Sequence, residues 1–136
     1  MPLHPLLARA LRRSKRLQKF FDSLPQSSRN DFDHFIRSVK KEATRLRRLD
    51  QSIELLTTAM EAELDPPPAL ARALAQNQQA RRGWELLPQS SRRWWLIDIF
   101  RSPYPETRAR HLEWGLREWA RYADSHGSIT NSDVET

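Results

Sequence analysis

The chain has 136 residues, enough for one domain or two very small ones. Its 23 Lys and Arg against 17 Asp and Glu give a net charge of +6, and 38% apolar residues is ordinary for a soluble protein. The lack of Cys excludes disulfides, thiolate metal sites and cysteine nucleophiles, and three Gly argue against Gly-rich phosphate loops. This composition disfavours most classes of enzyme.

The N-terminal segment carries no targeting signal that we can identify. Arg residues follow its short apolar stretch directly, and no small-residue cleavage site is visible. No run in the chain approaches the roughly 20 apolar residues that a membrane-spanning helix needs. We therefore expect a cytoplasmic protein without a transmembrane segment.

An internal repeat organises the chain. The sequence Leu-Pro-Gln-Ser-Ser-Arg at 24–29 recurs at 87–92, an offset of 63 residues. At this offset 16 of the 51 gapless pairs from Leu7 to Thr57 are identical. The chain is therefore a tandem duplication. We predict a first unit at 5–63, a Pro-rich linker at 64–68, a second unit at 69–123 and a disordered tail at 124–136, with a docked C-terminal segment as the alternative for the tail.

Each unit is predicted to contain three helices. The first covers 5–23, with its copy at 68–86, and the prolines at positions 25 and 88 end it. The second begins after the Pro-Gln turn, with Ser27 and Ser90 as N-caps. Its buried stripe in the first copy is Phe32, Phe35, Ile36 and Val39.

The second copy of this middle helix reads differently. Residues 94–100, Trp-Trp-Leu-Ile-Asp-Ile-Phe, have the composition of a strand, but their alignment with the clearly helical first copy predicts a helix. The third helix begins near Thr44 and Thr107 and carries an a/d seam. The fold class is all-α, with six helices arranged as two tandem three-helix units.

Groups able to do chemistry are few. The four His show no metal-ligand spacing, and Ser27 and Ser90 have no visible His and Asp partners. Glu42 and Glu106 stand at helix starts, where the helix dipole favours negative charge, so they need no catalytic role. We expect no enzyme activity, no cofactor and no metal site.

Basic residues cluster at the predicted helix starts, where free backbone N–H groups and Arg together form an anion site. A structural network of internal ion pairs, for example from Arg45 and Arg108 to Asp22 or Glu85, is the alternative. The candidate anion- or partner-binding residues are Arg29, Arg45, Arg47, Arg48, Arg92, Arg93, Arg108, Arg110 and His111.

All five Trp lie between positions 84 and 119. Three of them align with apolar residues of the first copy, which predicts core positions. Trp94 and Trp114 instead align with Asp31 and Gln51, so we expect them to face outward or toward the other unit. There they could stack on bases, bind a peptide or bury the interface between the copies.

The second copy resembles the YdeI/OmpD-associated family, also labelled bacteriocin-protection proteins. The resemblance is carried by Trp84-Glu85-x-Leu87-Pro88-x-Ser90-x-Arg92 and by Pro105-Glu106-Thr107-Arg108-Ala109-Arg110. The first copy is a diverged version, and together the copies cover about 5–123. Many family members have a β-rich domain before a single helical module, whereas here we expect two modules and no such domain.

The resemblance implies a non-enzymatic role in envelope stress, including tolerance of cationic peptides or bacteriocins. We therefore expect a small binding or adaptor protein that acts through a protein partner. The alternative is a nucleic-acid-binding protein that places its Arg-rich helix starts on phosphates. The sequence carries no signal for an oligomeric state.

Overall fold

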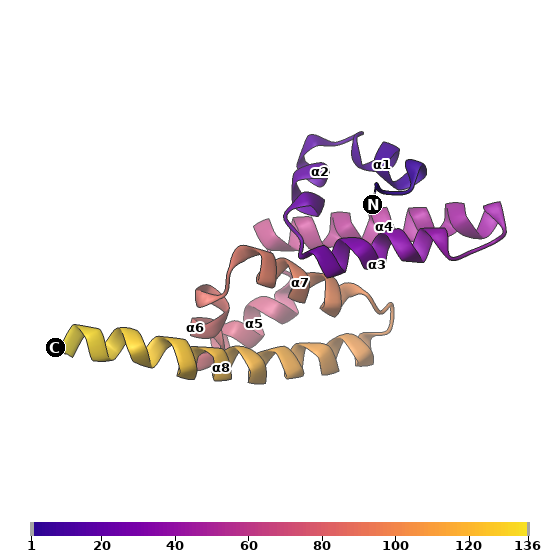
Figure 1. The fold of residues 1–136 in the computed structure, drawn as a ribbon. Coiled ribbons are helices and arrows are strands. Elements are labelled where there is room, and N and C mark those ends of the chain that lie inside the picture. Colours follow the sequence, from indigo (N-terminus) through magenta and orange to yellow (C-terminus); the bar gives the residue numbers. More distant parts are fainter. Residues whose placement is uncertain (1, 136) are drawn as a thin grey trace.

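A computed structural model describes the backbone of residues 2–135 and the side chains through Gly127. This part of the chain contains helices and no strands, which confirms the all-α class (Figure 1). The first unit holds α1 (Pro5–Leu11), α2 (Lys15–Asp22), α3 (Gln26–Arg37) and α4 (Glu42–Leu64). The second holds α5 (Pro68–Gln76), α6 (Gln78–Leu86), α7 (Gln89–Phe100) and α8 (Pro105–Glu135).

The prediction of six helices was wrong, because the first predicted helix of each unit is broken in two. In the first unit, Ser14 stops α1 from continuing and caps α2, with its hydroxyl accepting a hydrogen bond from the Leu17 N–H at 3.2 Å. In the second, the extended backbone of Asn77 separates α5 from α6, and its amide donates to the Ala73 carbonyl at 2.7 Å. Ser and Asn side chains compete with helical hydrogen bonds in this way.

The predicted N-caps of α3 and α7 were also wrong. Helices α3 and α7 begin one residue before Ser27 and Ser90, directly after a proline, and no side chain caps them. Helices α4 and α8 begin two residues before Thr44 and Thr107. Each of these helices therefore starts slightly earlier than its hydroxyl residue suggests.

The long helices α4 and α8 are the helices on which the shorter helices of each unit pack. In the first unit α2 and α3 pack on α4, and in the second α6 and α7 pack on α8. Helix α7 also packs against α4, so it lies between the two units (Figure 1). Buried side chains of both units form one apolar cluster. The duplicated units are therefore joined through α4 and α7.

The central position of α7 explains its strand-like composition. Trp95, Leu96, Ile97 and Ile99 are all buried, and they lie around most of the helix circumference. A helix packed on two sides needs apolar residues on two faces and loses its amphipathic pattern. In α3 the residues matching Leu96 and Ile97 are Asp33 and His34, so α3 keeps a polar outer face.

Helices α6 and α8 approach each other very closely at Gly83. A Cβ atom at this position would lie 1.7 Å from the Trp119 carbonyl oxygen. In the first unit Phe20 and Leu56 stand at the matching positions. The second unit has thus exchanged a Phe and a Leu for a Gly and a Trp, and its helices are correspondingly closer.

The described part of the predicted disordered tail, 124–127, is instead a continuation of α8. Asp124 accepts a hydrogen bond from Gln79 at 2.6 Å, and the Gly127 carbonyl accepts one from Arg82 at 3.2 Å. These contacts hold the helix against α6. The side chains of 128–135, and all of Thr136, lie outside the described part of the chain.

Candidate binding groove between the two units

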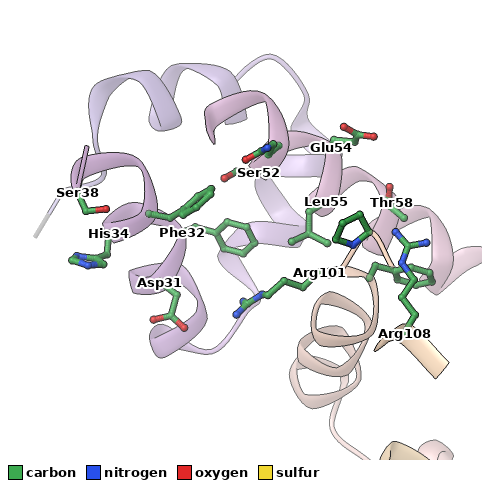
Figure 2. A pocket seen from close by; sticks show the side chains of 14 residues that line it. Asp31, Phe32, His34, Ser38, Ser52, Glu54, Leu55, Thr58, Arg101 and Arg108 are labelled. Atoms are coloured by element: carbon green, nitrogen blue, oxygen red, sulfur yellow. The ribbon is translucent and has the colours of Figure 1, made fainter. Parts of the chain in front are cut away.

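A groove of about 660 Å³ opens where the first unit meets the second (Figure 2). Helices α3 and α4 form one side, and the end of α7 with the following loop forms the other. Its lining combines an apolar floor with charged side chains at the rim. The floor residues are Phe32, Phe35, Leu55, Phe100 and Pro103, and the rim charges are Asp31, Glu54, Arg101 and Arg108.

Phe35 was predicted to be buried, and this was wrong. Its side chain is 37% exposed, and one face is covered by the Arg48 guanidinium, 4.5 Å from the ring centroid. Ile36, the next residue, is fully buried. The buried face of α3 is therefore narrower than predicted, and Phe35 lies at the groove instead.

Among the predicted site residues, Arg45 and Arg48 hold the end of α3. The guanidinium of Arg45 donates to the Ile36 and Val39 carbonyls at 3.2 and 2.6 Å and to Glu42 at 2.6 Å. Arg48 donates to the Phe35 carbonyl at 2.8 Å. A cation suits the carbonyls at a helix C-terminus, which carry partial negative charge.

The second copy repeats this arrangement at the end of α7. Arg108 donates to the Ser102 carbonyl at 2.6 Å and lies over the Phe100 ring at 5.5 Å. His111, which stands at the position of Arg48, contacts the Asp98 carboxylate at 2.7 Å. Neither Arg45 nor Arg108 contacts Asp22 or Glu85, the acids suggested for internal pairing.

Arg29 and Arg92 occupy matching positions but make different contacts. Arg92 donates to the Leu87 carbonyl at 2.8 Å, beyond the last turn of α6. Arg29 donates to Gln26 at 2.9 Å, while its buried Nε has no hydrogen-bond partner. Arg47 and Arg110 are exposed and reach only Thr44 and Thr107 of their own helices, at 3.4 and 3.2 Å.

Arg93 joins the two units. Its guanidinium pairs with both carboxylate oxygens of Glu63 on α4, at 2.6 and 2.8 Å, and also donates to the Ser23 hydroxyl. It lies over the Phe20 ring at 5.1 Å. The Arg93 and Glu63 side chains are 14% and 21% exposed. This bidentate pair therefore fixes α7 against the first unit in a largely dry environment.

The predicted basic clusters do not converge on one anion site. Because Arg45 bonds the C-terminal carbonyls of α3, the start of α4 lies beside the end of α3, and Arg29 lies at the opposite end of that helix. Of the nine predicted residues, Arg108 alone lines the groove.

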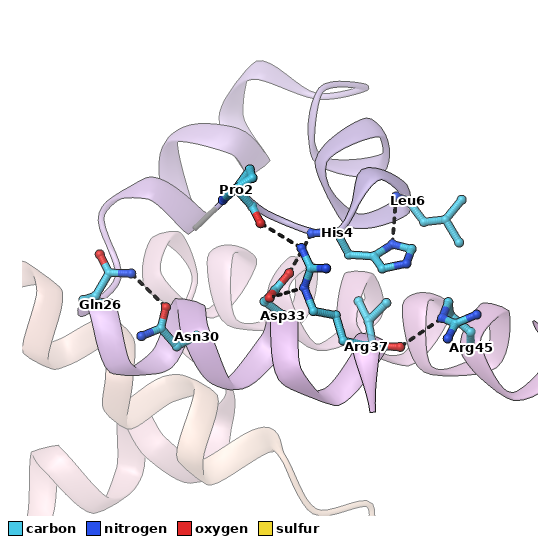
Figure 3. Close-up of polar contacts among 9 residues, drawn as sticks. Pro2, His4, Leu6, Gln26, Asn30, Asp33, Arg37 and Arg45 are labelled. Atoms are coloured by element: carbon cyan, nitrogen blue, oxygen red, sulfur yellow. Dashed lines mark hydrogen bonds and ion pairs between the residues drawn. The ribbon is translucent and has the colours of Figure 1, made fainter. Parts of the chain in front are cut away.

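A polar network on α3 ties the N-terminal segment to the first unit (Figure 3). Asp33 accepts hydrogen bonds from the His4 backbone N–H and from Arg37, both at 2.6 Å. Arg37 also donates to the Pro2 carbonyl at 2.8 Å. Neither Asp33 nor Arg37 lines the groove, so this network and the groove lie on different faces of α3.

The five Trp form one connected cluster in the second unit. Trp84 and Trp119 have ring centroids 4.6 Å apart, and Trp119 contacts Trp95 at 5.5 Å. Trp95 contacts Trp94 at 5.0 Å and Trp114 at 4.9 Å. Trp114 is 41% exposed and Trp94 is half-buried. Trp114 is thus exposed, as its alignment predicted, whereas Trp94 was also predicted to be exposed and is instead half-buried against Trp95 and Trp114.

The fold and the groove define the molecule as a duplicated helical module with a concave surface at the junction of its copies. In the described part of the chain, no helix combines the length and apolarity needed to cross a membrane. The family model described as bacteriocin-protection, YdeI or OmpD-associated matches residues 1–58 and again 63–122. The chain belongs to this family, with two copies of its module. No curated protein and no solved structure matches it.

Proposed function

We propose that this chain is a non-enzymatic binding or adaptor protein that contributes to protection against bacteriocins, antimicrobial peptides or envelope stress, and that it acts in the cytoplasm. The observation that carries the proposal is the groove between the units. It offers an apolar floor with charges at its edge, the composition of a surface that binds a protein segment. Membership of the family supports the link to protection.

Survival of cells under bacteriocin or cationic-peptide challenge tests this proposal. We expect cells that produce the chain to survive better than cells without it, and we expect Phe35→Ser to remove most of the gain. Phe35 is exposed in the groove, so its loss should leave the fold intact. Leu46→Ser is the matched control, because Leu46 is 47% exposed and lies outside the groove. Equal survival with and without the chain would contradict the proposal.

Nucleic-acid binding is the second candidate, favoured by the net charge of +6. Most of the candidate Arg residues already bond carbonyls or carboxylates, which leaves few of them for phosphates. We therefore expect weak binding to a mixed DNA and RNA pool, falling by less than about tenfold between roughly 50 and 200 mM salt. Tight binding with a steep salt dependence would favour this second candidate over the first.

A further inference from the structure

In the second copy of the module, side chains of the chain itself occupy the place that corresponds to the groove. Trp95 corresponds to Phe32, and it is covered on its outer side by Trp94 and Trp114. The ring centroids of Trp94 and Trp114 lie 6.4 Å apart with the rings close to perpendicular, a favourable aromatic geometry. Two indoles therefore close the surface between α7 and α8.

The first copy lacks both of these indoles. Asp31 and Gln51 stand at the positions of Trp94 and Trp114, and both line the groove beside Phe32. Short or flexible polar side chains leave uncovered the space that the two Trp occupy in the second copy. The groove is thus open at a place where the same fold elsewhere holds aromatic rings.

The charges at the rim add a second constraint. Asp31, Glu54 and Arg101 line the groove, and none of them has an ion pair among the residues that the structure describes. Arg101 extends from the second unit toward Asp31 (Figure 2). With Arg108, the rim carries two carboxylates and two guanidinium groups, but Arg108 is held by the Ser102 carbonyl. The unpaired carboxylates of Asp31 and Glu54 are therefore positions where a basic group of a ligand can pair.

We infer that the groove binds an aromatic side chain, best an indole, presented by a basic peptide segment. The ring lies against Phe32 as Trp114 lies against Trp95, and a flanking Lys or Arg pairs with Asp31 or Glu54. This inference rests on the proposed function, because it names the chemistry of the partner that the groove would bind.

The test uses the full-length chain labelled with ¹⁵N and the capped tripeptide Lys-Trp-Lys, with amide shifts as the readout. We expect saturable shifts confined to residues 31–38, 51–58 and 100–108, the segments around the groove. Lys-Ala-Lys should bind about tenfold more weakly because the buried ring is absent. Glu-Trp-Glu should also bind more weakly, because its carboxylates cannot pair with Asp31 or Glu54.

Two matched variants test whether the groove itself is the site. Gln51→Trp restores the indole of the second copy, so it should fill the groove and weaken Lys-Trp-Lys binding about tenfold or more. Glu61→Trp adds the same indole at an exposed position of α4 outside the groove, and it should leave binding unchanged. Equal binding of Lys-Trp-Lys and Lys-Ala-Lys, wild-type binding by Gln51→Trp, or shifts elsewhere on the molecule would overturn the inference.

The survival experiment keeps the two proposals distinguishable. Protection that depends on Phe35 without binding of Lys-Trp-Lys overturns the inference about the ligand and leaves the proposed function standing. Binding of Lys-Trp-Lys in the groove without any protection supports the ligand chemistry and overturns the role in protection.

Discussion

Gly83→Ala should lower the free energy of unfolding by about 3 kcal/mol, the upper part of the usual range for overpacking a core. In most helix interiors the same change stabilises a protein by up to about 1 kcal/mol. Here the new methyl group would meet the Trp119 carbonyl oxygen at 1.7 Å, and a contact with backbone can relax only if α6 and α8 separate. Urea unfolding followed by circular dichroism measures the change.

Gly127→Ala is the control for this substitution. Its Cβ would lie 2.9 Å from the Arg82 guanidinium, the mobile end of a long side chain that can move aside. We expect stability to be unchanged or up to about 1 kcal/mol higher, through the better helix propensity of Ala. A Gly83→Ala variant as stable as Gly127→Ala would show that α6 and α8 are not in backbone contact.

Arg93→Met should cost about 2–3 kcal/mol, because it leaves the Glu63 carboxylate desolvated without its partner. The matched control is Arg81→Met. Arg81 pairs with Glu85 along one helix, with both side chains more than 60% exposed, and such pairs contribute less than about 1 kcal/mol. Chemical denaturation of both variants gives the comparison.

The double variant Arg93→Met with Glu63→Met distinguishes the net contribution of the ion pair to stability from the cost of burying an unpaired carboxylate. Replacing both partners by apolar side chains should recover a large part of the loss, since the carboxylate is no longer buried alone. Arg93→Met with the stability of Arg81→Met would contradict the role of this pair in joining the units.

The helical class, the duplication and the family followed from the sequence. Because the repeat has no gaps, a helix that is clear in one copy could be assigned to the matching residues of the other copy. That transfer identified 94–100 as helix in spite of its composition. It did not reveal the breaks at Ser14 and Asn77. A single capping residue inside a long helix-like stretch gives too weak a signal against the surrounding propensity.

The groove could not be predicted from the sequence, because its shape depends on the tertiary arrangement. Its walls come from α3, α4 and the loop after α7, and their contact depends on how the two units dock. The Arg residues were recognised as a group, but their partners are mainly backbone carbonyls, which every residue carries and no pattern marks. The pairing of Arg93 with Glu63 likewise joins elements from different units.

The two units form one body, and the groove exists because they do. The distribution of Trp allows a direct measurement, since fluorescence of the intact chain reports the second unit alone while circular dichroism reports the helices of both. In urea the two signals should change together, with one midpoint, as in a two-state transition. Separate midpoints, with helix content lost in two steps, would show that the units fold independently and would contradict the claim.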